Sequence, residues 1–458
     1  MLARFEVENF LSFDKKVEFS LIAGDVRTKK KHLIEDRNIK ILKTAVLYGA
    51  NASGKSNLVR AINFAKDIIV EGLEKVNVLN SHYRLNENNI NKPTIFNFEI
   101  KAGTRYYSYG FGVILSKNQI LEEWLYEISE AGEKLIFERI KDEEDVHQIN
   151  FGLKLLGDAK KRFDVYKDDF KSSDNLLFLS EINRKSLNDI QQQILPLIEV
   201  YAWFDKKLTV IFPCSRFQGL SFVGDNTQMS DTFNEYLHIF QTGIKKVASK
   251  TENFDNIRIP DAIKQQIRKD VKKEFEKDNI KDNSTLLFSV NGKSFTLFQN
   301  KEGEYIIKKL GLEHESDCGK SVVFDMDEES DGTQRLLDLI PALSQIVKND
   351  RVYVIDEIDR SLHSKLTYSL FEIFLQLSTN CESQLIATTH ESLLLDLDLF
   401  RKDEIWFVEK ENNSSRIYSL DEFKVRNDKA IRKDYLLGRY GAIPIFKSFK
   451  NIDTCQID

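Results

Sequence analysis

The sequence has 458 residues, which is long enough for two or three domains or for one large domain carrying an insertion. Hydrophobic residues make up 41% and charged residues 30% of it, as in ordinary globular proteins, and with 20 Gly and 6 Pro no long low-complexity linker is expected. The formal net charge of −6 argues against a protein coated by nucleic acid over its whole surface, although local basic patches stay open.

The cysteines and the N-terminus indicate a reduced, cytoplasmic protein. The four cysteines lie far apart and include no Cys-x-x-Cys pair, which excludes the usual zinc-site and disulfide patterns. The first ten residues contain Arg4, Glu6 and Glu8, so we expect no signal peptide. No apolar run approaches the roughly 20 residues that cross a bilayer, and we expect no membrane association.

The N-terminal part of the chain predicts a strand, a glycine loop and a helix in that order. Residues 2–10 and 16–22 alternate as strands do, and an apolar stretch at 41–48 runs directly into a glycine-containing loop. Residues 57–70 then carry apolar side chains at helical spacing. This is the context in which such a loop binds phosphate.

The next region predicts an accessory antiparallel sheet followed by a mainly helical stretch. Four successive strands separated by turn residues are expected at 94–99, 106–115, 120–128 and 134–140. Helices are expected at 186–201, 232–247 and 262–277, and short strands at 284–290, 294–299 and 305–310. No heptads are sustained over three or four turns, so a long coiled-coil arm is not expected.

The last third returns to strands alternating with helices. Strands are expected at 321–326, 351–355, 384–388 and 404–409, with helices at 333–347 and 362–377. Apolar strands in such alternation indicate a sheet covered by helices on both faces. The sequence therefore predicts a nucleotide-binding core in two halves, 1–91 and 286–458, separated by an antiparallel β subdomain at 92–153 and a mainly helical insertion at 154–285.

The first chemical motif is a G-x-x-x-x-G-K-S loop. Its glycines let backbone N–H groups turn inward around phosphates, and the following helix N-terminus adds a positive dipole end. Lys55 would reach the β- and γ-phosphates, and the Ser56 hydroxyl would ligate Mg²⁺. The alternative is a chance glycine turn before a helix. The candidate nucleotide-binding residues are Gly49, Asn51, Ala52, Ser53, Gly54, Lys55, Ser56 and Asn57.

The second motif is an apolar strand, residues 352–355, that ends in Asp356 and Glu357. Such a strand places carboxylates at the carboxyl edge of the sheet, where ligands sit in α/β folds. Asp356 would hold Mg²⁺ through its water shell, and Glu357 would polarise the attacking water. Taken alone, a strand ending in two acids is more often a solvated strand end, but the phosphate loop makes the functional interpretation the stronger one.

Two further motifs flank this strand. Ser330, Asp331 and Gly332 open a helix, where Ser330 is a candidate N-cap and the segment is also a candidate anion site. His390 ends an apolar strand at 385–389. A lone histidine is usually structural, but its position one helix and one strand after Asp356 favours a functional role.

The four motifs in this order resemble the ABC-type ATPase heads of SMC-like and DNA-repair proteins. The chain is most similar to compact prokaryotic ATPases that are classed with the AAA family although built like ABC heads. These are the RloA/AbiLi-type subunits of antiphage, or abortive-infection, systems, which are related to the ATPase half of OLD-family proteins. The residues that carry the resemblance are GANASGKSNL for Walker A, ESDGTQRLL for the signature, VYVIDEIDRSLH for Walker B and the D-loop, and IATTH for the switch histidine. The segments FEVENFLSF and LLGRYGAIP also look characteristic, whereas 155–285 matches nothing by residue.

The resemblance implies an α/β P-loop NTPase of ABC-ATPase type, in which two heads sandwich ATP and Mg²⁺. Lys55, Glu357 and His390 would act in catalysis, and Ser56 and Asp356 in metal binding. Residues 330–332 of the second head would cap the γ-phosphate, with Ser361 and His363 in the D-loop. The signature reads SDGTQ and departs from the transporter-like SGGQ. The carboxylate of Asp331 beside a phosphate is costly unless it faces away or toward Mg²⁺ or a lysine. The family's glutamine loop has no clear counterpart.

The same resemblance implies a homodimer or higher homo-oligomer and a separate effector. Only 68 residues (458 − 390) follow His390, whereas a TOPRIM nuclease domain needs on the order of a hundred. Asp396 and Asp398 therefore read as a coincidental acidic turn. A nuclease of TOPRIM or RloB type, encoded nearby, is the expected partner.

Two alternatives stay open at this stage. A DNA-maintenance ATPase would clamp nucleic acid directly, and a transporter ATPase, which ranks last, would dock on a membrane partner. The candidate phosphate contacts for the first lie in two basic runs, whose commoner role is as solvated surface. They are Arg27, Lys29, Lys30, Lys31 and His32, and Lys264, Arg268, Lys269, Lys272, Lys273 and Lys277.

Overall fold

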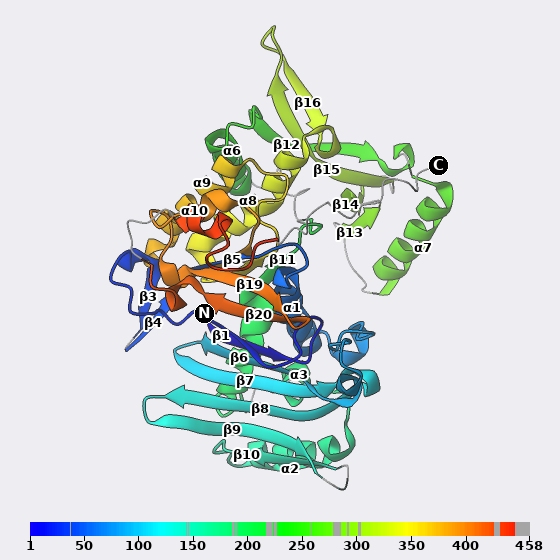
Figure 1. The fold of residues 1–458 in the computed structure, drawn as a ribbon. Coiled ribbons are helices and arrows are strands. Elements are labelled where there is room, and N and C mark those ends of the chain that lie inside the picture. The colour runs from blue at the N-terminus through cyan, green and yellow to red at the C-terminus, as the bar shows by residue number, and fades with distance from the viewer. Residues whose placement is uncertain are drawn as a thin grey trace, which may run out of the picture. The chain divides into compact units, whose positions relative to one another are not determined.

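The computed structural model describes residues 1–36, 38–142, 144, 146–185, 187, 190–216, 223, 227–257, 259–277, 285–290, 293–300, 304–425 and 431–444 (Figure 1). By its contacts the chain divides into two compact units. Unit 1 comprises Met1–Pro213, Ile346–Asp359 and Thr367–Asp458, and unit 2 comprises Cys214–Gln345 and Arg360–Leu366. These limits differ from the region boundaries expected at 91, 153 and 285.

The central sheet of unit 1 has the strand order β11-β17-β18-β5-β19-β20. All neighbours are parallel except β19 and β20, which form an antiparallel hairpin. β5, β17 and β18 are buried at every position, as expected for parallel strands covered on both faces. The strands are β5 (Thr44–Tyr48), β11 (Leu208–Ile211), β17 (Val352–Ile355), β18 (Gln384–Thr388), β19 (Ile405–Glu411) and β20 (Ser414–Ser419).

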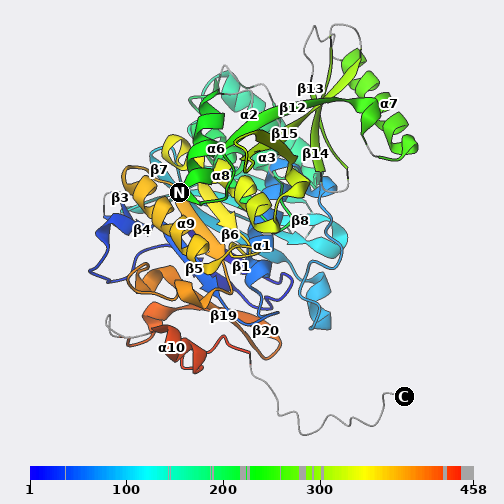
Figure 2. The same ribbon diagram turned by 90° about the horizontal axis from the view of Figure 1, so that it is seen from above.

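Two helices matter most for the site beside this sheet. α1 (Lys55–Val70) buries Leu58, Ile62, Ala65 and Ile69, which recur every three to four residues on one face. α10 (Ile431–Leu436) lies beside β19, where the ring of Tyr435 stacks on Phe407 at 5.6 Å (Figure 2). The expected helix at 57–70 is confirmed and begins two residues earlier.

A second sheet in unit 1 is antiparallel, with the order β10-β9-β8-β7-β6-β1-β2. The four expected strands of the accessory sheet are confirmed, and β10 is an additional strand. The opening strands join the same sheet, with Phe5 opposite Phe98, so they extend the accessory sheet. The strands are β1 (Leu2–Glu8), β2 (Val17–Ser20), β6 (Thr94–Ala102), β7 (Arg105–Ile114), β8 (Gln119–Ser129), β9 (Gly132–Lys141) and β10 (His147–Phe151).

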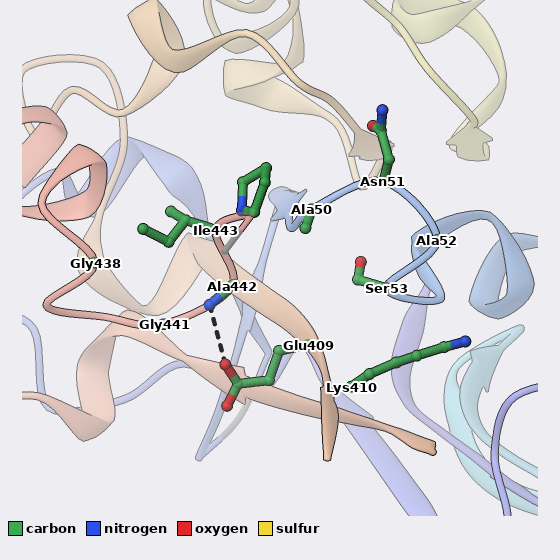
Figure 3. A pocket seen from close by; sticks show the side chains of 11 residues that line it. Ala50, Asn51, Ala52, Ser53, Glu409, Lys410, Gly438, Gly441, Ala442 and Ile443 are labelled. Carbon is green, nitrogen blue, oxygen red and sulfur yellow. Dashed lines mark hydrogen bonds between the residues drawn. The ribbon is translucent and has the colours of Figure 1, made fainter. Parts of the chain in front are cut away.

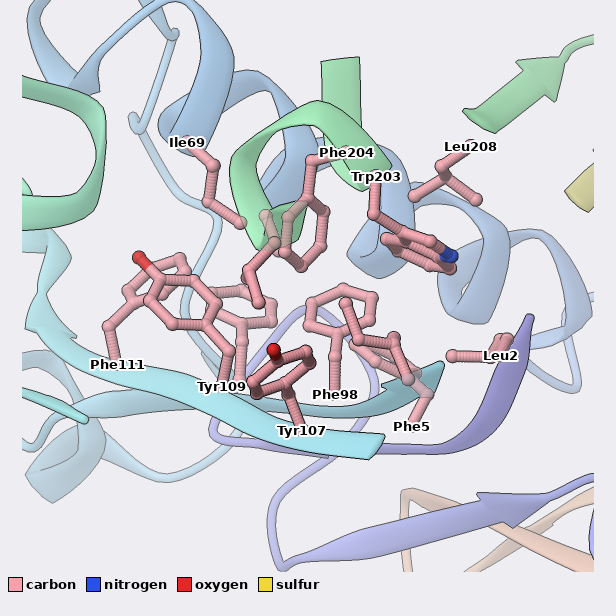
Figure 4. Close-up of a cluster of buried hydrophobic side chains, with 14 of the residues drawn as sticks. Leu2, Phe5, Ile69, Phe98, Tyr107, Tyr109, Phe111, Trp203, Phe204 and Leu208 are labelled. Carbon is pink, nitrogen blue, oxygen red and sulfur yellow. The ribbon is translucent and has the colours of Figure 1, made fainter. Parts of the chain in front are cut away.

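An aromatic cluster packs against this antiparallel sheet (Figure 4). The Phe98 ring lies 4.7 Å from that of Phe5 and 5.0 Å from that of Phe204, and all three residues are fully buried. Phe204 belongs to a π-helical turn, Trp203–Lys207, that follows α4 (Leu195–Ala202) and leads directly into β11. The segment expected to be mainly helical therefore contributes a core strand, which at four residues is too short to show strand periodicity.

Unit 1 contains further strands and α-helices. They are β3 (Leu33–Asp36), β4 (Ile39–Leu42), α2 (Asp158–Asp169), α3 (Phe178–Arg184) and the greater part of α9 (Ser364–Leu377). Among the described residues, no helix combines the length and the apolar character needed to cross a membrane.

Unit 2 contains a sheet of five strands in which β15 pairs with β12, β14 and β16. The expected strand at 321–326 forms, but its assignment to the strand–helix alternation is wrong, because it turns back on β15 as an antiparallel hairpin. The elements are α6 (Thr227–Ile239), β12 (Lys246–Asn253), α7 (Asp261–Lys277), β13 (Thr285–Val290), β14 (Lys293–Gln299), β15 (Tyr305–Glu315), β16 (Ser321–Asp325) and most of α8 (Asp331–Asn349).

The prediction of a helix at 232–247 is wrong for its last eight residues, 240–247. α6 ends at Ile239, because Gln241 and Gly243 adopt positive φ angles of 52° and 81° that an α-helix cannot contain. The chain then enters β12, where Val247 pairs with Leu312 of β15.

The aromatic cluster gives a direct test of the core. We expect Phe98→Ala to lower the free energy of unfolding by about 3–5 kcal/mol, because it removes a fully buried ring and leaves a cavity. Leu79→Ala is the matched control, since Leu79 is 76% exposed and its truncation should change stability by less than about 0.5 kcal/mol. Denaturant titration measures both, and equal effects would contradict this account of the core.

Candidate functional site

The phosphate loop connects the end of β5 to the start of α1. Tyr48 is the last residue of β5 and Lys55 the first of α1, and Gly54 forms the N-cap with φ of 115°. Ala52 also has a positive φ, 61°. The first N–H groups of a helix lack intrahelical partners, so those of Lys55 and Ser56 are available to an anion at the loop.

Ser12 and Ser415, which are distant in sequence, form hydrogen bonds that hold this loop in place. The Ser415 hydroxyl of β20 lies 2.6 Å from the Ser53 carbonyl oxygen and 2.8 Å from the Ser12 hydroxyl. The Asn57 amide donates to the same Ser12 hydroxyl at 2.9 Å. A Cβ on Gly54 would lie 2.8 Å from Ser12 Oγ, so only glycine fits there. Ser12 belongs to the characteristic opening segment, but no sequence motif indicates that either serine contacts the loop.

Lys55 is held inside the loop. Its side chain is 5% exposed, and its ammonium donates to the carbonyl oxygens of Gly49 at 2.7 Å and Ala50 at 3.2 Å. Burial lowers the pKa of Lys55 to about 8, and the nearby carboxylates of Asp356 and Glu357 oppose that shift. The ammonium is therefore charged at neutral pH and partly stripped of water, which strengthens its attraction to an anion.

The structure brings Ser56 and Asp356 together although they are 300 positions apart in sequence. Asp356 follows β17 and is 4% exposed. The Ser56 hydroxyl donates to Asp356 Oδ1 at 3.0 Å, and the Thr388 hydroxyl donates to the same oxygen at 2.6 Å. A serine hydroxyl beside a carboxylate is an oxygen set of the kind that binds Mg²⁺ together with water and phosphate.

Thr388, the last residue of β18, holds three consecutive residues of the acidic segment. Its hydroxyl donates to Asp356 and accepts from the backbone N–H of Glu357 at 2.8 Å, while its carbonyl accepts from that of Ile358 at 3.1 Å. Glu357 has φ of 46°, an uncommon conformation outside glycine. Thr388 is fully buried, and its contacts stabilise that conformation. No feature of a Thr-Thr pair in the sequence indicates this role.

His390 lies two residues beyond Thr388. Its backbone N–H lies 3.3 Å from each carboxylate oxygen of Asp359, which fixes the start of the histidine segment. Burial, and then the charge of Lys55, lower the pKa of His390 below its ordinary value. A lowered pKa favours the neutral imidazole, which offers one donor and one acceptor nitrogen.

The residues of the loop fit a phosphate group with a divalent cation. The Ser53 hydroxyl is buried and has no hydrogen-bond partner within the part of the chain that the structure describes. Among the described residues, the Lys55 ammonium donates its hydrogen bonds to carbonyl oxygens of its own loop. An unpartnered donor and a desolvated cation at the N-terminus of α1 together favour a bound anion.

The other predicted residues belong to unit 2. Ser330 is the N-cap of α8 as expected, since its hydroxyl accepts from the backbone N–H of Thr333 at 3.2 Å. Gly332 packs on the D-loop, because a Cβ there would lie 2.7 Å from the carbonyl oxygen of Ser361. His363 accepts from the Lys365 N–H at 3.2 Å at the start of α9. Asp331 is exposed.

The mixed α/β sheet and the contacts of the loop identify the fold as that of a P-loop nucleoside triphosphatase. The family model described as "AAA domain, putative AbiEii toxin, Type IV TA system" matches residues 45–396 of this chain. The match covers well over half of the 458 residues, and it includes both the phosphate loop and His390. The chain belongs to this AAA domain family.

Two solved structures show a distant likeness. One is described as the crystal structure of the SmcHead bound to the C-winged helix domain of ScpA, with a TM-score of 0.40 and 12% identity over 91% of this chain and 97% of that chain. The other is an SMC head domain from Thermotoga maritima, with a TM-score of 0.35 and 12% identity over 91% and 98%. Similarity at this level bears on neither activity nor partners. No curated protein matches the sequence.

Thr388 provides a test of the site geometry. We expect Thr388→Val to raise the Mg²⁺ concentration needed for half-maximal nucleotide binding by roughly tenfold, because losing a buried hydrogen bond to a charged group costs about 1.5–3 kcal/mol. Thr388→Ser keeps the hydroxyl and should restore the wild-type value. Mg²⁺ titration of nucleotide binding, alongside thermal unfolding, measures this. Equal Mg²⁺ requirements in the Val and Ser variants would contradict the assigned role.

Proposed function

We propose that this chain is an ATP-hydrolysing, ABC-type ATPase subunit of a prokaryotic antiphage defence complex and that it controls a separate toxic effector. The observation that carries the ATPase part is the contact between Ser56 and Asp356 beside the desolvated Lys55. The description of the family, which includes a putative AbiEii toxin, supports the defence part. The similarity to RloA/AbiLi-type and OLD-family sequences supports it further.

In this proposal the phosphate loop holds the nucleotide phosphates. Lys55 exchanges its hydrogen bonds to Gly49 and Ala50 for phosphate oxygens, and the helix N-terminus adds N–H donors. Ser56 would ligate Mg²⁺ and Asp356 would hold it through water, and the hydrogen bond between these two residues supports this assignment. Bound Mg²⁺ supplies charge neutralisation at the phosphates.

Glu357 and His390 then act on the attacking water and the γ-phosphate. The left-handed backbone of Glu357 directs the chain away from the strand immediately after Asp356. Its carboxylate accepts a hydrogen bond from water and raises the nucleophilicity of that water. The neutral imidazole of His390 donates a hydrogen bond to the transferred phosphoryl group and stabilises charge that develops there.

We further propose that the site closes when two copies of the chain meet. Ser330, Asp331 and Gly332 of the second copy would cap the γ-phosphate and give a homodimer or a higher homo-oligomer. Gly332 of the signature packs on Ser361 of the D-loop, which supports the view that these two segments form one continuous surface. Asp331 is exposed, so its carboxylate is free to turn away from the phosphate and avoid like-charge repulsion.

The effector in this proposal is a nuclease of TOPRIM or RloB type, encoded nearby, and the complex acts in the cytoplasm. Binding of ATP would hold the effector in the assembled complex, and hydrolysis would reset the assembly. The ATPase would then act mainly as a sensor.

Two substitutions test this function. We expect Lys55→Ala to abolish detectable nucleotide binding and Glu357→Gln to keep binding while lowering hydrolysis by about 10²–10⁴-fold, the usual contribution of a positioned general base. Glu357→Gln should also trap an ATP-dependent oligomer and preserve the effector complex, as seen by light scattering and co-purification. Both variants should lose protection in a phage challenge of cells that carry the neighbouring gene.

Several outcomes would contradict the proposal. Phage protection that survives both substitutions would remove the defence role, whereas unchanged hydrolysis in Glu357→Gln would remove the assigned chemistry. Disassembly of the effector complex by Glu357→Gln in the presence of ATP would contradict the holding role. Lys117→Gln, an exposed substitution outside the site, serves as the control.

A basic loop favours direct DNA clamping as the second candidate function. Arg27, Lys30 and Lys31 are exposed and form no ion pair with another described residue. The loop is held in place by the buried Arg401, whose guanidinium donates to the carbonyl oxygens of Val26 at 3.1 Å and Thr28 at 2.8 Å. A fixed loop with three free cations suits phosphate contacts.

The other candidate contacts are weaker. His32 is not free, because its imidazole lies 3.0 Å from the buried carboxylate of Glu404. On α7, Arg268 pairs with Asp255, and Lys264 donates to the carbonyl of the same residue at 2.7 Å. The side chains of Lys272, Lys273 and Lys277 lie outside the described residues.

The salt dependence of DNA binding tests this second candidate. Neutralising Arg27, Lys30 and Lys31 together by glutamine should lower the slope of log K against log salt by about 0.9 for each lost phosphate contact. The control replaces three scattered exposed lysines, Lys117, Lys134 and Lys160, by glutamine and makes the same change in net charge. Equal slopes for the two triple variants, or no DNA binding by the wild type, would exclude clamping through this loop.

A further inference from the structure

A cavity of about 740 Å³ lies beside the phosphate loop in unit 1 (Figure 3). One wall is the outer part of the loop, Ala50 to Ser53, and the opposite wall is a turn from Gly438 to Pro444. Glu409 and Lys410 of β19 form the floor between them. Ligand pockets for small molecules have volumes of roughly 300–1,000 Å³, so this cavity has room for a base and a sugar.

The turn that forms the second wall is preformed. Glu409 accepts from the backbone N–H of Ala442 at 3.0 Å, and the Tyr418 hydroxyl donates to the Tyr440 carbonyl at 2.7 Å. The Tyr435 hydroxyl donates to the Ala442 carbonyl at 3.1 Å. The turn is therefore tied to β19, β20 and α10 at three points, and no ligand is needed to build it.

Glycine is required at one position of this turn. Gly441 has φ of 68°, and a Cβ there would lie 2.6 Å from the Tyr418 hydroxyl and closer still to the Glu409 carboxylate. A larger residue would push the turn away from both anchors. The characteristic late segment LLGRYGAIP therefore forms a fixed wall of the cavity opposite the phosphate loop. The sequence alone does not indicate this role.

The strand order places this cavity on one side of the loop and the acidic residues on the other. In the order β17-β18-β5-β19, Asp356 and Glu357 follow β17, whereas the cavity lies at β19. In the proposed function, the terminal phosphate faces Glu357. A nucleotide bound in that direction extends across the end of β5 toward β19, because its phosphates and its nucleoside lie at opposite ends of the molecule.

The lining suits a flat, mostly apolar group with polar edges. Ala50, Ala52, Ala442 and Ile443 supply apolar surface on both walls (Figure 3). Lys410 is exposed and offers a donor at the floor. Pockets of this composition, apolar walls with few polar groups, are the usual sites of small ligands.

We propose that this cavity receives the nucleoside of the bound triphosphate and that the turn from Gly438 to Pro444 is its recognition wall. The proposal rests on the proposed ATPase function and adds to it a binding subsite formed by the C-terminal part of the chain. In this arrangement the turn recognises the nucleoside, and the loop binds the phosphates.

Two ligands separate these roles: Mg²⁺ with ATP, and Mg²⁺ with inorganic triphosphate, which lacks the nucleoside. We expect Ile443→Gln, which keeps size and charge but loses the apolar contact, to weaken ATP binding about tenfold, a change of about 1.4 kcal/mol. Gly441→Ala, which displaces the wall, should weaken it at least as much. Neither substitution should change the dissociation constant of triphosphate by more than about twofold, which is much less than the tenfold change expected for ATP.

Leu436→Gln is the matched control, because Leu436 is 60% exposed on α10 and outside the cavity. Isothermal titration of the full-length chain gives each dissociation constant, and thermal unfolding verifies that the variants fold. Equal weakening of both ligands, or of neither, would overturn the nucleoside subsite while leaving the ATPase function intact. Failure of the wild type to bind either ligand would instead overturn the proposed function, and the subsite with it.

Discussion

One carboxylate oxygen connects the parts of this site. Asp356 Oδ1 accepts from Ser56 of the phosphate loop at 3.0 Å and from Thr388 of β18 at 2.6 Å. Because Thr388 also holds the backbone of Glu357 and Ile358, a single buried carboxylate couples the loop, the acidic strand end and the histidine segment. A buried charge is costly unless it is hydrogen-bonded, so these contacts are mutually dependent.

The parallel sheet makes this convergence possible. β17, β18 and β5 run side by side in the same direction, so their carboxyl ends meet at one edge although their residues are far apart in sequence. The fourth parallel neighbour, β19, extends the same edge and carries Glu409 and Lys410 toward the cavity. The turn from Gly438 to Pro444 closes that side, so the loop lies between an acidic edge and a preformed wall.

Sequence patterns predicted the elements that are long or carry a motif. The helix after the loop, the four strands of the accessory sheet and the capping role of Ser330 are confirmed, because periodicity and residue chemistry are local properties. Sequence patterns gave wrong or missing elements where the structure depends on contacts with distant parts of the chain. The short strand β11 shows no period, β16 pairs back on β15, and α6 stops at a turn of positive φ angles.

The sequence by itself determined the residues of the candidate site: a glycine loop with Lys55 and Ser56, two acids after an apolar strand, and a histidine after the next strand. Only the tertiary structure decided how these residues are held. Ser12 and Ser415 behind the loop, Thr388 beneath the acids and the turn at Gly441 carry no motif of their own. Their roles come from hydrogen bonds and close packing between segments hundreds of residues apart, and such contacts exist only once the sheet has formed.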